Sequence, residues 1–439
     1  MNKLDKYISR HYENSEHWFV EEVGQTWHRE RIEKILNSRD YLSGNHKIKR
    51  RADEIHKGKV FNTKKIGLRY ANTLLKFETA FTLKKPVTLT SNDEDALSIY
   101  KTIYQEGQYH YVDYNILSKM VKYGEVYEYV FIDENNRIKS ILYNGEDSYP
   151  VYDENSNMIA FIYHYTYDGV DYYTVYTDDY VTDYNNDGGY VHRDGDVQRN
   201  ASGLPIPYIL ESELDELVGE PSYYDYLDII DSMEELLSKS FDAYYKFLSP
   251  LPIFKGNILN QKEGSVDANA VGYALQISED SDFEFKTAKN DYQTFKEIYK
   301  TLKQAMLDIS MTPGISMNSQ EISNISETSI KMLYGMAEIK GIENKMYLIR
   351  GFNTRWGYMK QMIRELGNDI DENAYIGAEF NFNIPQNESE VVSNLIQLTG
   401  GKQIMSVDRA VEINPYTLDV ALELDRLFSD NINDDVEVE

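Results

Sequence analysis

The sequence contains no cysteine among its 439 residues. This absence excludes disulfide bonds, zinc sites with thiolate ligands and a thiol nucleophile. No run of about 18 apolar residues occurs, so the sequence predicts no membrane-spanning helix. Its first residues also lack the apolar core of a secretion signal. We therefore expect a soluble protein of a cytoplasm-like compartment.

Sequence motifs for catalysis are missing as well. Gly400-Gly401-Lys402 only superficially resembles a phosphate-binding loop, because position 396 is Ile where the pattern needs Gly, and no Ser or Thr follows the Lys. The eight histidines show no metal-binding or general-base arrangement. Paired carboxylates are common in so acidic a chain, so they are weak support for a metal nuclease. We expect no enzyme, no catalytic residue and no cofactor.

Charge is unevenly distributed along the chain. The formal net charge is −28, yet residues 28–85 hold 16 Lys and Arg against 6 Asp and Glu. We interpret this basic stretch as a solvated face that pairs with acidic neighbours, and nucleic-acid binding as the alternative. The acidic remainder argues against tight wrapping of DNA, since phosphate contacts need a basic surface. An acidic wall would suit a passage through which DNA slides without sticking.

The pattern of apolar residues predicts both helices and strands. We expect helices through much of residues 1–60, at 62–81, 93–106 and 111–123, and a strand at 87–90. Residues 124–210 alternate in β fashion, with strands at 125–132, 138–143, 148–152, 158–166 and 172–180. Twenty of the 38 tyrosines fall between positions 100 and 190. We interpret them as one half-buried face of a sheet, rather than as a platform for stacking bases.

Two long amphipathic helices, here called rods, are predicted at 222–248 and 291–310. Between them lies a small insert with strands at 251–254, 273–277 and 283–286. An uncharged loop at 315–326, a long helix to about residue 366, a strand at 379–383 and two or three short helices at 387–428 follow. Two rods that carry a small tip cannot bury their apolar faces alone, and a closed ring of copies would bury them.

One stretch is similar to a calcium-binding loop. Asp183, Asn185, Asp187 and Asp194 occupy ligand positions of that template, except that Asp replaces the usual final Glu. Strands are predicted on both sides, and Asp, Asn and Gly are also typical of a hairpin turn. We favour the turn, and adventitious calcium binding is the alternative.

Several segments, in this order, resemble the portal proteins of tailed bacteriophages, of the kind found in long-tailed phages of Gram-positive hosts. They are Arg69-Tyr70-Ala71-Asn72-Thr73 through Lys85-Pro86-Val87-Thr88, Gly124-Glu125-Val126-Tyr127-Glu128, Ser148-Tyr149-Pro150-Val151-Tyr152-Asp153, Leu204-Pro205-Ile206-Pro207-Tyr208, Ser310-Met311-Thr312-Pro313-Gly314, Ser326-Glu327-Thr328-Ser329-Ile330-Lys331 and Phe382-Asn383-Ile384-Pro385-Gln386-Asn387. Lys84 departs from the family's aromatic-Gly-Lys-Pro-Val segment, which has Gly at that place. The likeness covers roughly residues 50–430.

The resemblance implies an α+β fold with named parts. They are an N-terminal helical arm (1–60), a wing with a Tyr-rich sheet (61–218), stem helix 1 (219–248), a small α/β clip (249–290), stem helix 2 (291–312), a tunnel loop (313–326), a long kinked helix with a returning wing strand (327–384), and a helical crown with an acidic tail (385–439).

The resemblance also implies a function. Portal proteins form a ring of about twelve subunits at one capsid vertex, through which the terminase motor packages DNA and through which DNA is ejected. Implied partners are further copies of the chain, the terminase large subunit, head-tail connector proteins, major capsid and scaffolding proteins, and double-stranded DNA bound without sequence preference. The implied location is the virion, after assembly in the host cytoplasm. The alternative is another virion assembly protein, a capsid or connector subunit.

Two sets of residues are candidates for contact with DNA in such a channel. The first is small and uncharged and lies in the tunnel loop: Ser316, Asn318, Ser319, Gln320, Asn324 and Ser326. The second consists of Lys296, Lys300 and Lys303 on the second rod, for which ordinary surface charge is the alternative. We expect transient contacts with the DNA backbone and no reading of base sequence.

Overall fold

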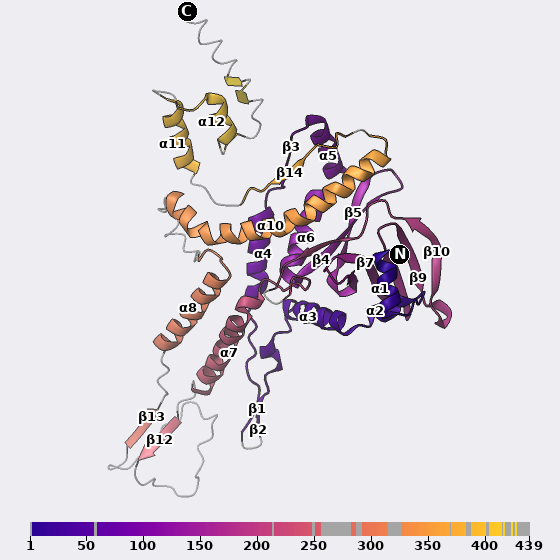
Figure 1. Ribbon diagram of the computed structural model, residues 1–439. Coiled ribbons are helices and arrows are strands. Elements are labelled where there is room, and N and C mark those ends of the chain that lie inside the picture. Colours follow the sequence, from indigo (N-terminus) through magenta and orange to yellow (C-terminus); the bar gives the residue numbers. More distant parts are fainter. Residues whose placement is uncertain are drawn as a thin grey trace, which may run out of the picture.

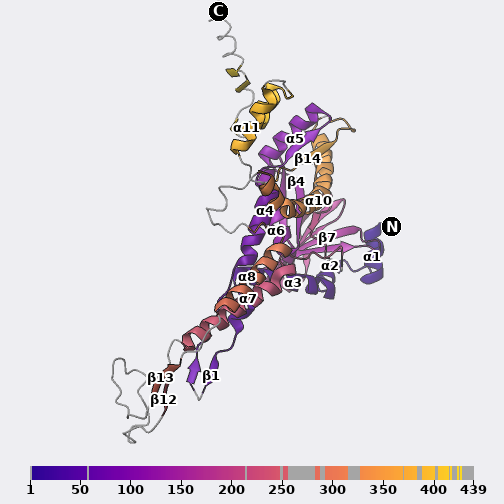
Figure 2. The same ribbon diagram turned by 90° about the vertical axis from the view of Figure 1, so that its left-hand side faces the viewer.

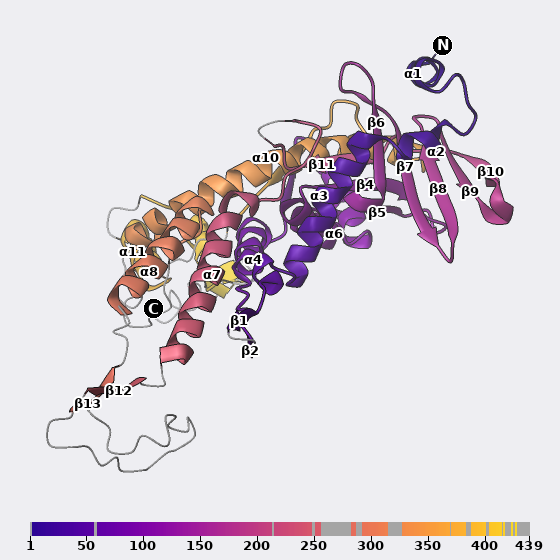
Figure 3. The same cartoon turned by 90° about the horizontal axis from the view of Figure 1, so that it is seen from below.

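The computed structural model describes residues 2–427 except for 57–58, 213–214, 248–250, 256–281, 287–291, 315–326, 369, 383–387, 401–403, 415, 418–422 and 425. Figure 1 shows a mixed helix-and-sheet body from which two long helices extend to a small hairpin. Seen from below, those two helices lie at one end of the molecule and a five-stranded sheet lies at the other (Figure 3). No helix within the described ranges is long and apolar enough to cross a membrane.

The N-terminal arm is helical, as predicted, up to about residue 50. It comprises α1 (Lys3–His11), α2 (Trp18–Val23), α3 (Thr26–Ser43) and the 3₁₀ helix η1 (Lys47–Arg50). Trp18 and Phe19 of α2 pack on the five-stranded sheet. The prediction was wrong for the end of this region, which forms an antiparallel hairpin of β1 (Glu54–His56) and β2 (Lys59–Phe61).

The helix predicted at 62–81 begins later, because α4 spans Tyr70–Leu83. Residues 64–68, here called the strap, are extended instead of helical. Their backbone N–H groups donate to side chains of a distant helix, which replaces the hydrogen bonds that a helix would have supplied.

The body is built on a three-stranded sheet in the order β11-β4-β5, with β4 (Glu125–Ile132), β5 (Ile138–Asn144) and β11 (Ile206–Ile209). The predicted helices are confirmed as α5 (Glu94–Glu106) and α6 (Tyr109–Tyr123). Asp93 caps α5 by accepting hydrogen bonds from the backbone N–H groups of Asp95 and Ala96. Ile116, Leu117 and Met120 of α6 are fully buried in the main core.

The second sheet has five antiparallel strands in the order β10-β9-β8-β7-β6. Its strands are β6 (Ser148–Tyr152), β7 (Met158–Tyr167), β8 (Val170–Tyr176), β9 (Tyr180–Asn185) and β10 (His192–Arg199). The single strand predicted at 172–180 is therefore two strands, because Thr177 and Tyr180 hydrogen-bond across a tight turn. The tyrosines of this sheet include both buried and exposed residues, from Tyr176 at 4% to Tyr167 at 71% exposure, in agreement with a half-buried sheet.

Both rods are confirmed. The first is α7 (Tyr224–Phe247) and the second is α8 (Tyr292–Ile309), and they pack side by side (Figures 1 and 2). Beyond them, β12 (Leu251–Lys255) and β13 (Asp282–Lys286) form an antiparallel hairpin at the far tip. These strands confirm two of the three predicted for the insert, and the strand predicted at 273–277 lies outside the described residues.

The long helix is α10 (Glu327–Glu365), which crosses the top of the body above α4. The returning strand predicted at 379–383 was placed too late, because β14 (Ile376–Glu379) pairs with β3 (Thr88–Ser91). Phe380 and Phe382 lie beyond this strand, where the ring of Phe380 packs on Phe352 and the ring of Phe382 packs on Phe81. Helices α11 (Glu388–Thr399) and α12 (Val407–Ile413) follow, and Gly400 lies between them.

Candidate functional site

The second rod presents three lysines on one side. Lys296, Lys300 and Lys303 follow each other at spacings of four and three residues, which places them on one face of α8. Lys296 and Lys300 are exposed and Lys303 is half-buried. The structure thus brings together the three lysines of the sequence prediction as one basic strip along the rod.

A different face of α8 holds the rod against the body. Met306 is fully buried in the main core, with Leu302 packed at its edge. The hydroxyl groups of Tyr299 and Tyr70 lie 3.2 Å apart, within hydrogen-bond distance, which joins α8 to the start of α4. Because these contacts fix the rotation of α8 about its axis, they also fix the direction in which the lysine strip faces.

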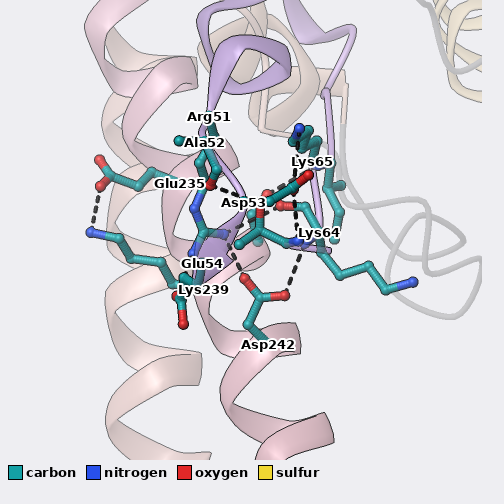
Figure 4. Close-up of polar contacts among 12 residues, drawn as sticks. Arg51, Ala52, Asp53, Glu54, Lys64, Lys65, Glu235, Lys239 and Asp242 are labelled. Carbon is teal, nitrogen blue, oxygen red and sulfur yellow. Dashed lines mark hydrogen bonds and ion pairs between the residues drawn. The ribbon is translucent and has the colours of Figure 1, made fainter. Parts of the chain in front are cut away.

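The first rod is held by the strap (Figure 4). Alternate N–H groups of the strap donate to acceptors that lie one helical turn apart on α7. The pairs are Lys64 N to Asp242 Oδ1 (2.9 Å), Ile66 N to Ser238 Oγ (3.0 Å) and Leu68 N to Glu234 Oε1 (2.5 Å). Donors two residues apart on an extended chain are about 6.6 Å apart, and acceptors four residues apart on a helix are about 6.0 Å apart, so the two repeats stay nearly in step over this length.

Charged side chains reinforce the N-terminal end of the strap. Arg51 donates to Asp242 Oδ2 at 2.6 Å, so Asp242 binds both an arginine and the strap (Figure 4). Near by, Asp53 accepts from the backbone N–H of Thr63 at 3.1 Å and lies 3.4 Å from Lys65 Nζ. The Thr63 N–H is the main cause that lowers the pKa of Asp53, and Lys65 adds to it.

The basic stretch at 28–85 is therefore engaged with acidic neighbours, as its preferred interpretation predicted. Arg31 forms a buried ion pair with Glu125 and also donates to the carbonyl groups of Gly145 and Ser148. On the surface, Arg39 lies 3.0 Å from Glu146. Nucleic-acid binding by this stretch stays a hypothesis that these contacts do not test.

Arg355 is the centre of a buried cluster that the sequence analysis missed. Its guanidinium donates to Asp113 Oδ1 at 2.5 Å and to Glu128 Oε2 at 2.9 Å, which ties α10 to α6 and β4. Tyr208 of β11 donates to Glu128 Oε2 at 2.7 Å. Burial raises the pKa of Asp113 to about 6, although Arg355 opposes that rise. The available signal was an arginine that shares the helical register of buried apolar residues of α10, such as Phe352.

Glu78 forms a second, half-buried junction, between α4, the segment before α7, and α10. It accepts hydrogen bonds from Ser222 Oγ at 2.8 Å and from Asn344 Nδ2 at 3.0 Å. Burial raises the pKa of Glu78, while nearby Lys340 and both hydrogen bonds act in the opposite direction. The junction therefore links the base of the first rod to the long helix.

The residues of the calcium-like loop lie in and around the β9–β10 hairpin. Asp183 accepts a hydrogen bond from Thr174 Oγ1 at 2.6 Å, and Asn185 donates to Asp194 Oδ2 at 3.0 Å. Asp187 receives the backbone N–H of Gly188 at 2.9 Å. Among the residues that the structure describes, no group of three or more His, Cys, Asp or Glu side chains is arranged to hold a metal ion.

The tunnel-loop candidates form the other predicted set. Ser316, Asn318, Ser319, Gln320, Asn324 and Ser326 all lie outside the described residues. The described segment that contains the second rod ends at Gly314, and the next described segment begins with α10 at Glu327. The loop is thus attached to the two helices that carry the lysine strip and the Glu78 junction.

The fold defines an α+β protein in which two rods and a terminal hairpin extend from a helix-and-sheet body. A family model described as "Phage portal protein, SPP1 Gp6-like" matches residues 25–436. The chain therefore belongs to this family of phage portal proteins. The family is one of structural proteins of phage particles, in agreement with the expectation from the sequence.

No curated protein matches the chain. Similar solved structures come from gene transfer agent (GTA) particles. A chain from the "neck of empty GTA particle computed with C6 symmetry" is 12% identical, with 78% of this chain and 89% of that chain covered and a TM-score of 0.45. A chain from the "virion of native gene transfer agent (GTA) particle" is 13% identical, with 77% of this chain and 87% of that chain covered and a TM-score of 0.44. A chain from the "neck of native GTA particle computed with C12 symmetry" is 11% identical, with 79% of this chain and 89% of that chain covered and a TM-score of 0.45. With TM-scores this low, membership rests on the family model alone.

Proposed function

We propose that the chain forms a ring of about twelve subunits at one capsid vertex. The genome enters through this ring, driven by the terminase motor, and leaves through it at infection. The observation that carries the proposal is the match to the portal family over residues 25–436. A ring also agrees with the physics of the rods, whose exposed apolar residues, such as Phe241 of α7 and Ile298 of α8, are not covered by the described part of the chain.

Each part of the chain has a proposed place in the ring. Rods α7 and α8 belong to the stem (219–248 and 291–312), and the hairpin of β12 and β13 belongs to the clip (249–290), where head-tail connector proteins dock. The two sheets form most of the wing (61–218), next to the arm (1–60). Residues 327–384 supply the long helix and returning strand, and 385–439 supply the crown. Terminase, major capsid protein and scaffolding protein are the remaining protein partners. The chain itself is in the host cytoplasm during assembly and afterwards in the virion.

Contact with DNA is proposed for the lysine strip of α8 and for the tunnel loop (313–326). Three lysines separated by single helical turns can follow a phosphate backbone without reading bases, since phosphate contacts carry no sequence information. The net charge of −28 opposes strong retention of DNA elsewhere on the chain. Weak, backbone-directed contact is what a passage needs, because the duplex must keep moving.

Electron microscopy tests this proposal. Negative-stain images of the purified chain, with native mass determination on the same sample, should show rings of about twelve subunits with a central hole wide enough for a duplex. Particles assembled with a variant that lacks residues 315–323 should contain normal rings but little DNA. A variant with a Gly/Ser segment of the same length in place of 315–323 separates loop length from loop side chains. Broken rings in either variant would show that the loop is structural instead.

A further inference from the structure

The first half of α10 has apolar residues on two opposite faces. One face is covered, because Tyr334 and Ala337 are buried against Phe77 and Phe81 of α4. The other face is open to solvent. It consists of Met332, Met336, Ile339, Ile342 and Met346, which are 78%, 50%, 55%, 47% and 65% exposed. These five residues are here called the α10 stripe.

An apolar face of this size is unusual on a single chain. The residues of the α10 stripe recur every three or four positions over 15 residues, so the stripe is about 21 Å long. Isolated exposed apolar residues are ordinary, but contiguous ones mark an interaction surface. A helix that is apolar on opposite faces is normally covered on both sides, and here the described part of the chain covers only one.

Gly335 lies within the α10 stripe and leaves room for close approach of a partner there. It lies inside α10 beside Met336, where glycine costs roughly 1 kcal/mol relative to alanine. Neighbouring glycines have a reason within the chain, because a Cβ on Gly341 would lie 2.9 Å from Phe382, and one on Gly351 would lie 2.2 Å from Tyr208. Among the described residues, a Cβ on Gly335 would meet nothing within 4 Å, and the same holds for Gly357 further along the helix. Packing within the described part of the chain therefore explains neither glycine, and Gly335 differs from Gly357 in lying among the residues of the α10 stripe, where a missing side chain permits close approach of another backbone.

The charges around the stripe favour a second copy of this chain as the occupant. The whole chain carries −28, so two copies repel each other over most of their surfaces. Residues 331–346 carry three lysines and two glutamates, so this segment is close to neutral with a slight positive excess. Lys340 and Glu343 also pair at 3.1 Å. Three of the five stripe residues are methionines, whose flexible side chains adapt to the shape of a partner.

We propose that the α10 stripe, with Gly335 as its point of closest approach, is a docking surface for a neighbouring copy of the chain. This inference rests on the proposed ring and names one of its contact surfaces. Contacts in a ring of more than two subunits are head-to-tail, so the stripe meets a different surface of the neighbour. Burial of the stripe supplies the apolar centre of that contact, and the lysines and glutamates beside it form the polar rim.

A charge placed in the stripe tests this inference against a matched control. Met336→Glu puts a carboxylate into the contact, whereas Thr354→Glu puts one on the same side of the same helix five turns later, outside the stripe, where Thr354 is exposed. Native mass determination over a concentration series gives the subunit concentration at half assembly. We expect Met336→Glu to raise it at least about tenfold, which corresponds to 1.4 kcal/mol per contact, and Thr354→Glu to leave it unchanged.

A pair of glycine variants gives a sharper comparison. Gly335→Ala and Gly357→Ala both add a methyl group that meets nothing within 4 Å in the chain, and both raise helix propensity by the same amount. Both variants should therefore match or exceed the wild type in the stability of the dissociated subunit. Only Gly335→Ala should weaken assembly, because its methyl group blocks the close approach.

Cross-linking identifies the contact directly, since the chain has no cysteine of its own. Met346→Cys labelled with a maleimide–benzophenone reagent should give a ladder of dimers, trimers and larger species on illumination. Dimers alone would mean that the stripe pairs with itself, and would overturn the head-to-tail contact. If Met336→Glu and Gly335→Ala assembled into rings at the same subunit concentration as the wild type, this inference would be overturned, and the proposal of a ring would still stand. A wild-type chain that never assembles would instead refute the ring, and the inference with it.

Discussion

Replacing Arg355 by Met should destabilise the chain severely. The substitution keeps most of the side-chain volume but removes the cation between Asp113 and Glu128, both of which are buried. Loss of one partner from a buried ion pair typically costs about 3–5 kcal/mol, because the remaining charge stays desolvated and unpaired. Here two carboxylates would be left, so we expect a value in the upper part of that range.

Arg350→Met is the matched control. Arg350 lies on the same helix, and its ion pair with Glu211 is short, at 2.6 Å, but its side chain is 78% exposed. Exposed pairs contribute about 1 kcal/mol or less, so the control should change little. The assay is urea denaturation at one fixed protein concentration, since assembly shifts apparent stability. Equal losses in the two variants would refute the assignment of the Arg355 cluster as a buried junction.

The pH dependence of the Arg355→Met defect provides a second check. In the wild type, burial raises the pKa of Asp113 to about 6, so this carboxyl favours the folded state most below about pH 4, and that contribution is lost as the pH rises through 6. Arg355 opposes the rise in pKa, so its removal must raise the pKa of Asp113 further. The variant should therefore regain stability relative to the wild type between pH 8 and pH 5. A defect of constant size over that interval would contradict the electrostatic explanation.

Three further predictions concern the strip, the arm and the strap. Changing Lys296, Lys300 and Lys303 together to Gln should leave rings intact and lower the salt slope of DNA binding by up to about 3, and an unchanged slope would exclude these lysines from contact. Burial lowers the pKa of His28 against the opposing effect of its carboxylate partner, so acidification from pH 7.5 to 5.5 should lower the hydrogen-exchange protection factors of the arm, each corrected for the intrinsic exchange rate at that pH, and His28→Gln should flatten this dependence. Ser238→Ala leaves a strap N–H without its acceptor, so urea denaturation should show a loss of about 1–3 kcal/mol, and no loss would mean that water replaces the hydroxyl.

The rods and the long helix could be predicted from the sequence because their signals are local. Apolar residues at helical spacing in 224–247, 292–309 and 327–365 specify helices whatever they pack against. The lysine strip follows from the same arithmetic, since spacings of four and three residues place side chains on one face before any partner is known. The order of these elements was also sufficient to suggest the portal family, which the family model confirmed.

Other features depended on residues far apart in the chain. Ile66 and Tyr70 have helical spacing, yet the strap is extended, because the acceptors for its N–H groups come from α7, about 170 residues later. The same holds for Arg355, whose partners lie about 230 to 240 residues earlier. The sequence by itself determined the two rods, the long helix and most of the other helices and strands, since those patterns repeat within a few residues. Only the tertiary structure decided which polar groups satisfy one another and which apolar face of α10 the described residues leave uncovered, because burial and hydrogen-bond pairing belong to the packed chain and not to any single segment.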